Sequence, residues 1–116
     1  METVKIKAGS SVKLVVNISS EAIVGSYVSL NDNVIKRSQL YTFSLNLGDI
    51  EEIDNSILSS ASNFFVSIGD IDPIFNNTKV TYTLEFAGNK KHIDGDKVKI
   101  NEDLFMAYFI VKLVKI

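Results

Sequence analysis

Apolar residues recur at every second position along several stretches of the chain. These stretches lie at residues 4–6, 12–18, 41–47 and 80–86, and the residues between the apolar positions are mostly polar. Because successive side chains of a strand point to opposite faces, this spacing predicts strands that bury one face and expose the other. Such strands are typical of antiparallel sheets, which commonly keep one face in contact with solvent.

The last part of the chain, residues 104–116, is apolar on both faces as far as Lys112. A strand of this kind is usually central in its sheet or covered on both sides. A partner protein or a second copy of the chain would supply such cover, either by packing on the face or by adding a strand at an edge. The candidate interface residues are Tyr108, Ile110, Val114 and Ile116.

Short polar sequences separate the expected strands. Asn31-Asp32-Asn33, Gly88-Asn89 and Asp94-Gly95 are typical of tight turns, because Asn, Asp and Gly tolerate the left-handed backbone that such turns require. The two glycine-containing pairs have the composition of hairpin turns. We therefore expect each of them to reverse the chain between two neighbouring strands.

One segment departs from the period of two. Its apolar residues are close to helical spacing, and Asp49 precedes Glu52 by three residues, as in a capping box. This segment predicts one short helix near residues 49–60. Together, the strands and this helix predict an all-β fold: an antiparallel two-sheet sandwich, immunoglobulin-like or jelly-roll-like, with about eight strands. The length of 116 residues matches one domain, so residues 1–116 are expected to form a single β-sandwich domain.

Composition excludes several classes of function. The chain has no cysteine, which removes disulfides, thiolate metal sites and cysteine nucleophiles. Its net charge of −2 argues against a nucleic-acid partner, which normally meets a basic face. The longest dense apolar run, residues 104–110, is too short for a membrane span, and residues 1–5 do not begin the basic and then apolar pattern of a signal peptide. We expect no membrane partner, and a protein that is cytoplasmic or part of a larger assembly.

Acidic residues are concentrated in the middle of the chain. No Lys or Arg lies between Ser44 and Thr78, whereas six acids do. If these acids share a face, the domain carries an acidic patch suited to a basic partner. The candidate acidic-patch residues are Asp49, Glu51, Glu52, Asp70 and Asp72.

Catalytic chemistry has little support in the sequence. His92 is the only histidine, lies beside an expected turn and belongs to no recognisable triad or metal motif. We therefore expect no enzyme, no catalytic residues, no metal site and no cofactor. The Asp70/Asp72 and Asp94/Asp96 pairs leave calcium binding as an alternative, because carboxylates on loops are calcium ligands.

The leading functional hypothesis is a non-enzymatic protein–protein interaction or assembly module. The partner is a protein or the chain itself, so a homo-oligomer is one form of the hypothesis, and a subunit of a larger complex such as a virion or appendage is another. The alternative is a carbohydrate- or calcium-binding β-sandwich module. Carbohydrate binding would use exposed aromatic side chains, and Tyr108 is the tyrosine on the second face of the last expected strand.

Overall fold

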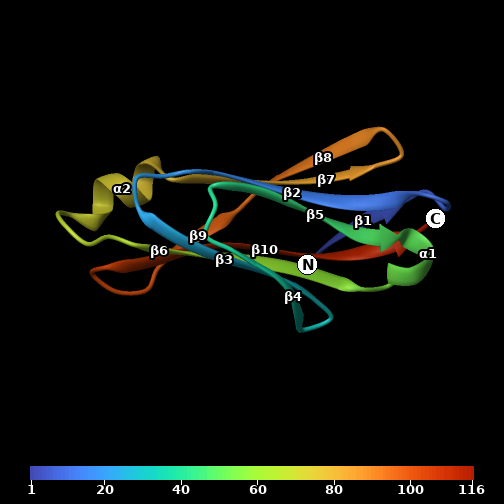
Figure 1. Ribbon diagram of the computed structural model, residues 1–116, viewed down its shortest axis with the longest axis horizontal. Coiled ribbons are helices and arrows are strands. Elements are labelled where there is room, and N and C mark those ends of the chain that lie inside the picture. The colour runs from blue at the N-terminus through green and yellow to red at the C-terminus, as the bar shows by residue number, and fades with distance from the viewer.

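Two β-sheets pack face to face in a computed structural model that describes residues 1–116 (Figure 1). The strands are β1 (Glu2–Ile6), β2 (Ser11–Ser19), β3 (Ile23–Leu30), β4 (Asn33–Ser38), β5 (Thr42–Asp49), β6 (Ile57–Phe65), β7 (Lys79–Phe86), β8 (Asn89–Asp94), β9 (Asp96–Lys99) and β10 (Leu104–Lys115), and the helices are α1 (Ile50–Ile53) and α2 (Ile71–Asn77). At four and seven residues, both helices fall well short of a membrane-spanning length.

The two sheets divide the strands unequally. Sheet A has the order β1-β10-β6-β3-β4, and sheet B has the order β5-β2-β7-β8. The edge of β10 opposite β6 is shared, since β9 pairs with its first half and β1 pairs with its last part. The predicted all-β, two-sheet sandwich is confirmed. It has ten strands rather than eight, and the β1–β10 pair is parallel.

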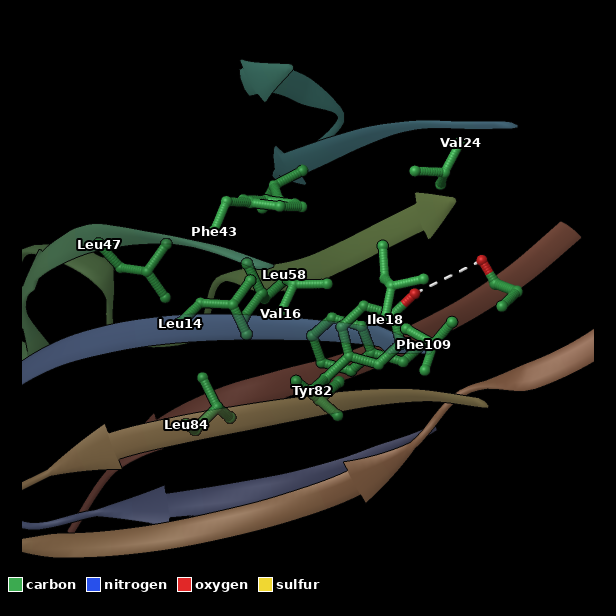
Figure 2. Packing of buried hydrophobic residues seen from close by; sticks show 14 of the residues in the cluster. Leu14, Val16, Ile18, Val24, Phe43, Leu47, Leu58, Tyr82, Leu84 and Phe109 are labelled. Carbon is green, nitrogen blue, oxygen red and sulfur yellow. Dashed lines mark hydrogen bonds between the residues drawn. The ribbon is translucent and has the colours of Figure 1, made fainter. Parts of the chain in front are cut away.

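The core lies between the two sheets, where the apolar positions of the alternating stretches meet (Figure 2). Leu14 of β2, Leu84 of β7 and Leu58 of β6 are completely buried, as the period of two predicted for the first two of them. The ring of Tyr82 from sheet B stacks on Phe109 from sheet A, with ring centroids 4.2 Å apart. Burial of apolar surface of this kind is the main favourable contribution to folding.

Tyr82 is the one ionisable side chain of this core. Its hydroxyl donates a hydrogen bond of 3.4 Å to the carbonyl oxygen of Ala107. Burial raises the pKa of Tyr82 to about 12, because the charged phenolate loses its hydration, and the hydroxyls of Ser62 and Ser60 oppose part of this rise. The neutral form of Tyr82 is therefore the one that the fold accommodates.

The expected turns at Asn31-Asp32 and at Gly88 are confirmed as two-residue hairpin loops. Asn31 and Asp32 have φ values of 51° and 68°, and Ala87 and Gly88 have values of 49° and 74°. Positive φ at both central residues is the geometry of a type I′ turn, which matches the twist of the flanking strands.

The hairpin expected at Asp94-Gly95 is wrong. Here the chain leaves β8 in sheet B and enters β9 in sheet A, so the two flanking strands pair with different neighbours. The backbone comes close to the core at this crossing: the amide of Gly95 donates to the carbonyl of Val80 at 2.9 Å, and a Cβ on Gly95 would lie 2.9 Å from Cε2 of Tyr82. Glycine is needed at this position for close approach rather than for a turn.

The short helix predicted near residues 49–60 is present, but it ends early. Only Ile50–Ile53 are helical, and β6 begins at Ile57. Asn55 has a φ of 65°, which ends the helical path, and Ser56 accepts a backbone hydrogen bond from Leu113 of β10. Sheet pairing therefore overrides the helical spacing, and the carboxylate of Asp49 accepts from the hydroxyl of Ser11 instead of capping α1.

The second helix, α2, was not expected from the apolar pattern. The carboxylate of Asp70 accepts from the amide of Asp72 at 3.0 Å and so caps its first turn. Pro73 is also placed in that turn, where its missing N–H costs nothing. An N-cap Asp followed closely by Pro is a helix-start signal that the sequence does contain.

Substituting Gly95 tests the close approach at the sheet crossing. We expect Gly95→Ala to lower the free energy of unfolding by ~1–3 kcal/mol, because the new methyl group overpacks the ring of Tyr82. Urea denaturation measures this change. Gly25→Ala is the matched control, since a Cβ on Gly25 meets nothing within 4 Å and Gly25 has no positive φ. Equal stability of the two variants would contradict the packing argument.

The raised pKa of Tyr82 predicts a loss of stability at high pH. Between its ordinary value of 10.0 and about 12, the unfolded chain has released the phenolic proton while the folded chain retains it. The free energy of unfolding therefore falls through this window, by up to ~3 kcal/mol, and this contribution is constant below it. Urea denaturation of the wild type and of Tyr82→Phe between pH 8 and 12 checks the prediction. A pH dependence that is identical in both proteins would rule it out.

Candidate functional site

The face of sheet A that points away from sheet B is the main apolar surface of the molecule; we call it the outer face of sheet A. Along β10, Phe105, Ala107 and Phe109 point inwards and are buried, whereas Tyr108 and Ile110 point outwards. These two residues are 37% and 46% exposed. β10 is central, as expected, but α1 and α2 lie at opposite ends of the sandwich and leave this face uncovered (Figure 1).

The strand register places five outward side chains in one row across the sheet. In order they come from β9, β10, β6, β3 and β4, and we call them the central row: Asp96, Tyr108, Ala61, Tyr27 and Arg37. The small Ala61 is 6% exposed although it points outwards, because a tyrosine flanks it on each side. The row therefore has an apolar, aromatic centre with a carboxylate at one end and a guanidinium at the other.

The two charged ends of the central row have no partners within the molecule. The structure contains two ion pairs, Lys91–Glu2 at 2.8 Å and Lys99–Asp72, and neither involves Asp96 or Arg37. No side-chain hydrogen bond of the protein includes Asp96 or Arg37 either, so both charges are free to meet a ligand.

A second row of the outer face, towards α2, is entirely apolar. It consists of Leu104, Phe65 and Ile23, which are direct neighbours in the register of β10, β6 and β3. Phe65 is 47% exposed and Ile23 is 62% exposed. Large apolar side chains this exposed, side by side, are typical of an interaction surface rather than of scattered surface residues.

Between these two rows the outer face is hollowed. Gly25 has no side chain here, and its row neighbours in β6 and β10 are Asn63 and Met106. The resulting open hollow has a volume of about 560 Å³, and its lining is mostly polar: Gly25, Ser26, Tyr27, Arg37, Ser38, Gln39 and Asn63. It joins Arg37, at one end of the central row, to the gap left by Gly25.

The outer face of sheet B has the opposite character. Its outward positions on β2 include Lys13 and Asn17, and those on β7 include Thr81, Thr83 and Glu85. Sheet B therefore has the usual character of an antiparallel sheet in a sandwich, with an apolar inner face and a mostly polar outer face. Val15 is the one apolar residue among the outward positions of β2 and β7, and it is half-buried. Only sheet A has large exposed apolar side chains on its outer face.

The structure places two of the four candidate interface residues together. Tyr108 and Ile110 lie near the centre of the outer face of sheet A. Val114 and Ile116 lie beyond Lys112, at the end of β10 that pairs with β1, where Val114 is half-buried and Ile116 is exposed. The sequence did not place Tyr27, Arg37 and Asp96 beside Tyr108, because only the strand register brings them together. The hollow at Gly25 was not foreseen for the same reason.

The five candidate acidic residues are not brought together. Asp49, Glu51 and Glu52 lie at α1, and Asp70 and Asp72 lie at α2, at opposite ends of a molecule 49 Å long (Figure 1). Several have local roles: Glu51 accepts from the amide of Gly9, Asp70 caps α2, and Asp72 pairs with Lys99. Their arrangement supports turns and helix ends rather than one acidic surface.

The remaining chemical candidates are dispersed. His92 lies on the edge strand β8, is exposed, and shares a hydrogen bond of 2.8 Å with the hydroxyl of Thr83. No group of three or more His, Asp or Glu side chains converges as metal ligands would. Asp94 and Asp96 are divided between the two sheets, with Asp94 on β8 and Asp96 on β9.

Comparisons of this chain with protein-family models, with curated proteins and with solved structures find no match.

Proposed function

We propose that this protein is a non-enzymatic interaction or assembly module that binds a protein partner through the outer face of sheet A. The observation that carries the proposal is the uncovered apolar surface formed by Tyr108 and Ile110 together with Phe65 and Ile23. Exposed apolar patches rimmed by polar groups mark protein interfaces. Tyrosine is also among the residues enriched at the centres of such interfaces.

The contrast between the two sheets supports the choice of surface. Both sheets bury one face in the same core, yet only sheet A has large exposed apolar side chains on its other face. Folding alone does not require them there, because the polar outer face of sheet B serves the same sandwich equally well. A partner that covers sheet A accounts for this difference.

Packing on the face is favoured over addition of a strand at the edge. Sheet A ends at β4 on one side and at β1 and β9 on the other. β4 is exposed along most of its length and carries Lys36 and Arg37, while β1 carries Lys5 and β9 carries Lys99. The pairing of β4 with β3 is irregular between Val28 and Ser29. Charged side chains and a bulge on an edge strand are devices that hinder pairing with another chain.

A photo-activated cross-linker placed on each sheet tests this proposal. We expect benzoylphenylalanine at Ile110, at the centre of the outer face of sheet A, to form a discrete covalent adduct with a protein partner in cells of the source organism. The matched control places benzoylphenylalanine at Lys13, which points outwards from the central strand β2 of sheet B. Adducts of equal yield at both positions, or none at position 110, would overturn the proposal, and thermal denaturation verifies that both variants fold.

Carbohydrate binding is a second candidate, and one observation favours it. The hollow between Tyr27, Arg37 and Asn63 combines an aromatic side chain with amide, hydroxyl and guanidinium groups, the types of group that recognise sugar rings and hydroxyls. Tyr108 lies two strands away in the central row and would extend the aromatic surface.

The second candidate predicts heat on titration with soluble oligosaccharides. Isothermal calorimetry of the wild type should show binding that Tyr27→Ala and Asn63→Ala each weaken by about tenfold or more, the loss expected for one buried hydrogen bond or stacking contact. A matched control is Thr83→Ala, on the outer face of sheet B. Absence of heat across glucans, chitin oligomers and uronic-acid oligomers would remove the candidate.

A further inference from the structure

We infer that the partner of the outer face of sheet A is a second copy of this chain, packed face to face about a two-fold axis that runs along the strands. This inference rests on the proposed function and adds the identity of the partner. It comes from the order of side chains in the central row, which is complementary to itself when the row is reversed. A two-fold interface requires such self-complementarity, because the same patch is used by both subunits.

The two charged ends of the central row determine how the copies match. Ala61 lies at the middle, with one tyrosine and then one charged residue on each side. An axis parallel to β6 at Ala61 reverses the row, so Tyr108 lies over Tyr27 of the second copy. Asp96 then lies opposite Arg37 of the second copy, and Arg37 lies opposite its Asp96. Asp96 and Arg37, which have no charged partner in one molecule, thus each face an oppositely charged residue in the dimer.

The other simple axis gives the reverse result. An axis across the strands, along the central row, would place Asp96 opposite Asp96 and Arg37 opposite Arg37. Like charges that face one another in an interface disfavour association. The charges therefore select one of the two orientations for a face-to-face pair.

The neighbouring rows agree with the orientation that the charges select. With the axis along β6, Phe65 lies over Phe65 of the second copy and Leu104 lies over its Ile23. The side chain of Met106 lies over the hollow at Gly25 of the second copy. The long, flexible methionine side chain would fill the space left by the glycine, as the interlocking side chains of packed sheet faces require.

The size of the face is adequate for a stable pair. The molecule is 49 Å long and 22 Å across its narrowest axis. A standard interface buries about 800 Å² on each partner, which fits within one face of these dimensions. The central row and the two adjacent rows would form its middle, with the aromatic side chains innermost and the charges at the rim, where complementary charges set orientation.

Reciprocal charge reversal tests this inference on the purified full chain. Sedimentation velocity over a concentration series should show a monomer–dimer equilibrium. Arg37→Asp and Asp96→Arg should each raise the dissociation constant by about tenfold or more, because each creates two like-charge contacts per dimer. The double variant should return to within about threefold of the wild type, since coupled residues are not additive.

Matched controls separate this effect from a change in net charge. Lys36→Asp alters the same edge strand next to Arg37, and Asp94→Arg alters the outward face of β8 in sheet B. Both should leave the dissociation constant within about threefold of the wild type, because neither lies in the central row. Far-ultraviolet circular dichroism and thermal denaturation confirm that each variant folds.

The outcomes distinguish this inference from the proposed function. A strict monomer at all concentrations, or a dimer indifferent to both single reversals, would overturn the second-copy inference. If the cross-linker at Ile110 then captures a different protein, the proposed function stands with another partner. If it captures nothing, both fall. A dimer that is weakened by each single reversal and restored by the double variant supports both.

Discussion

Burial of the inner side chains of β10 against sheet B is the interaction on which the rest of this structure depends. Phe109 stacks on Tyr82, and Phe105, Val111 and Leu113 extend the contact along the whole strand. β10 is also the strand with the most neighbours, since β1, β9 and β6 all pair with it. It therefore connects the two sheets through its side chains and organises sheet A through its backbone. The first strand of the chain, β1, is also held in the fold by pairing with it.

This central position explains why the other face of β10 is free to carry a binding surface. The inner face already supplies the strand's contribution to the core, and the backbone pairs with β6 on one edge and with β9 and β1 on the other. Residues such as Tyr108 and Ile110 can then be exposed without loss of the fold, because their removal from water is not needed to hold the sheets together. A rigid strand held on two edges is a good support for an interface, since little order has to be imposed on binding.

Local periodicity predicted the sheets well and the surface only in part. The inward residues of β2, β7 and β10 follow from a period of two, and the apolar second face of β10 pointed to Tyr108 and Ile110. Tyr27, Arg37 and Asp96 were not identifiable, because they come from three other strands and meet only through the register. The helix near residues 49–60 is shorter than its spacing indicated, and the hairpin expected at Asp94-Gly95 is wrong, for a related reason. In both places, pairing with distant strands decides the backbone path, and a local pattern contains no information about those strands.

The parallel pairing of β1 with the last part of β10 has a mechanical consequence. Glu2 lies beside Val111 and Ile6 lies beside Lys115, so the two strands run in the same direction. Tension applied between Met1 and Ile116 would pull these strands along their lengths in opposite senses. The hydrogen bonds of the pair would then be loaded together in shear instead of being opened one after another from an end. A sandwich connected in this way resists stretching best along the line that joins its own two termini.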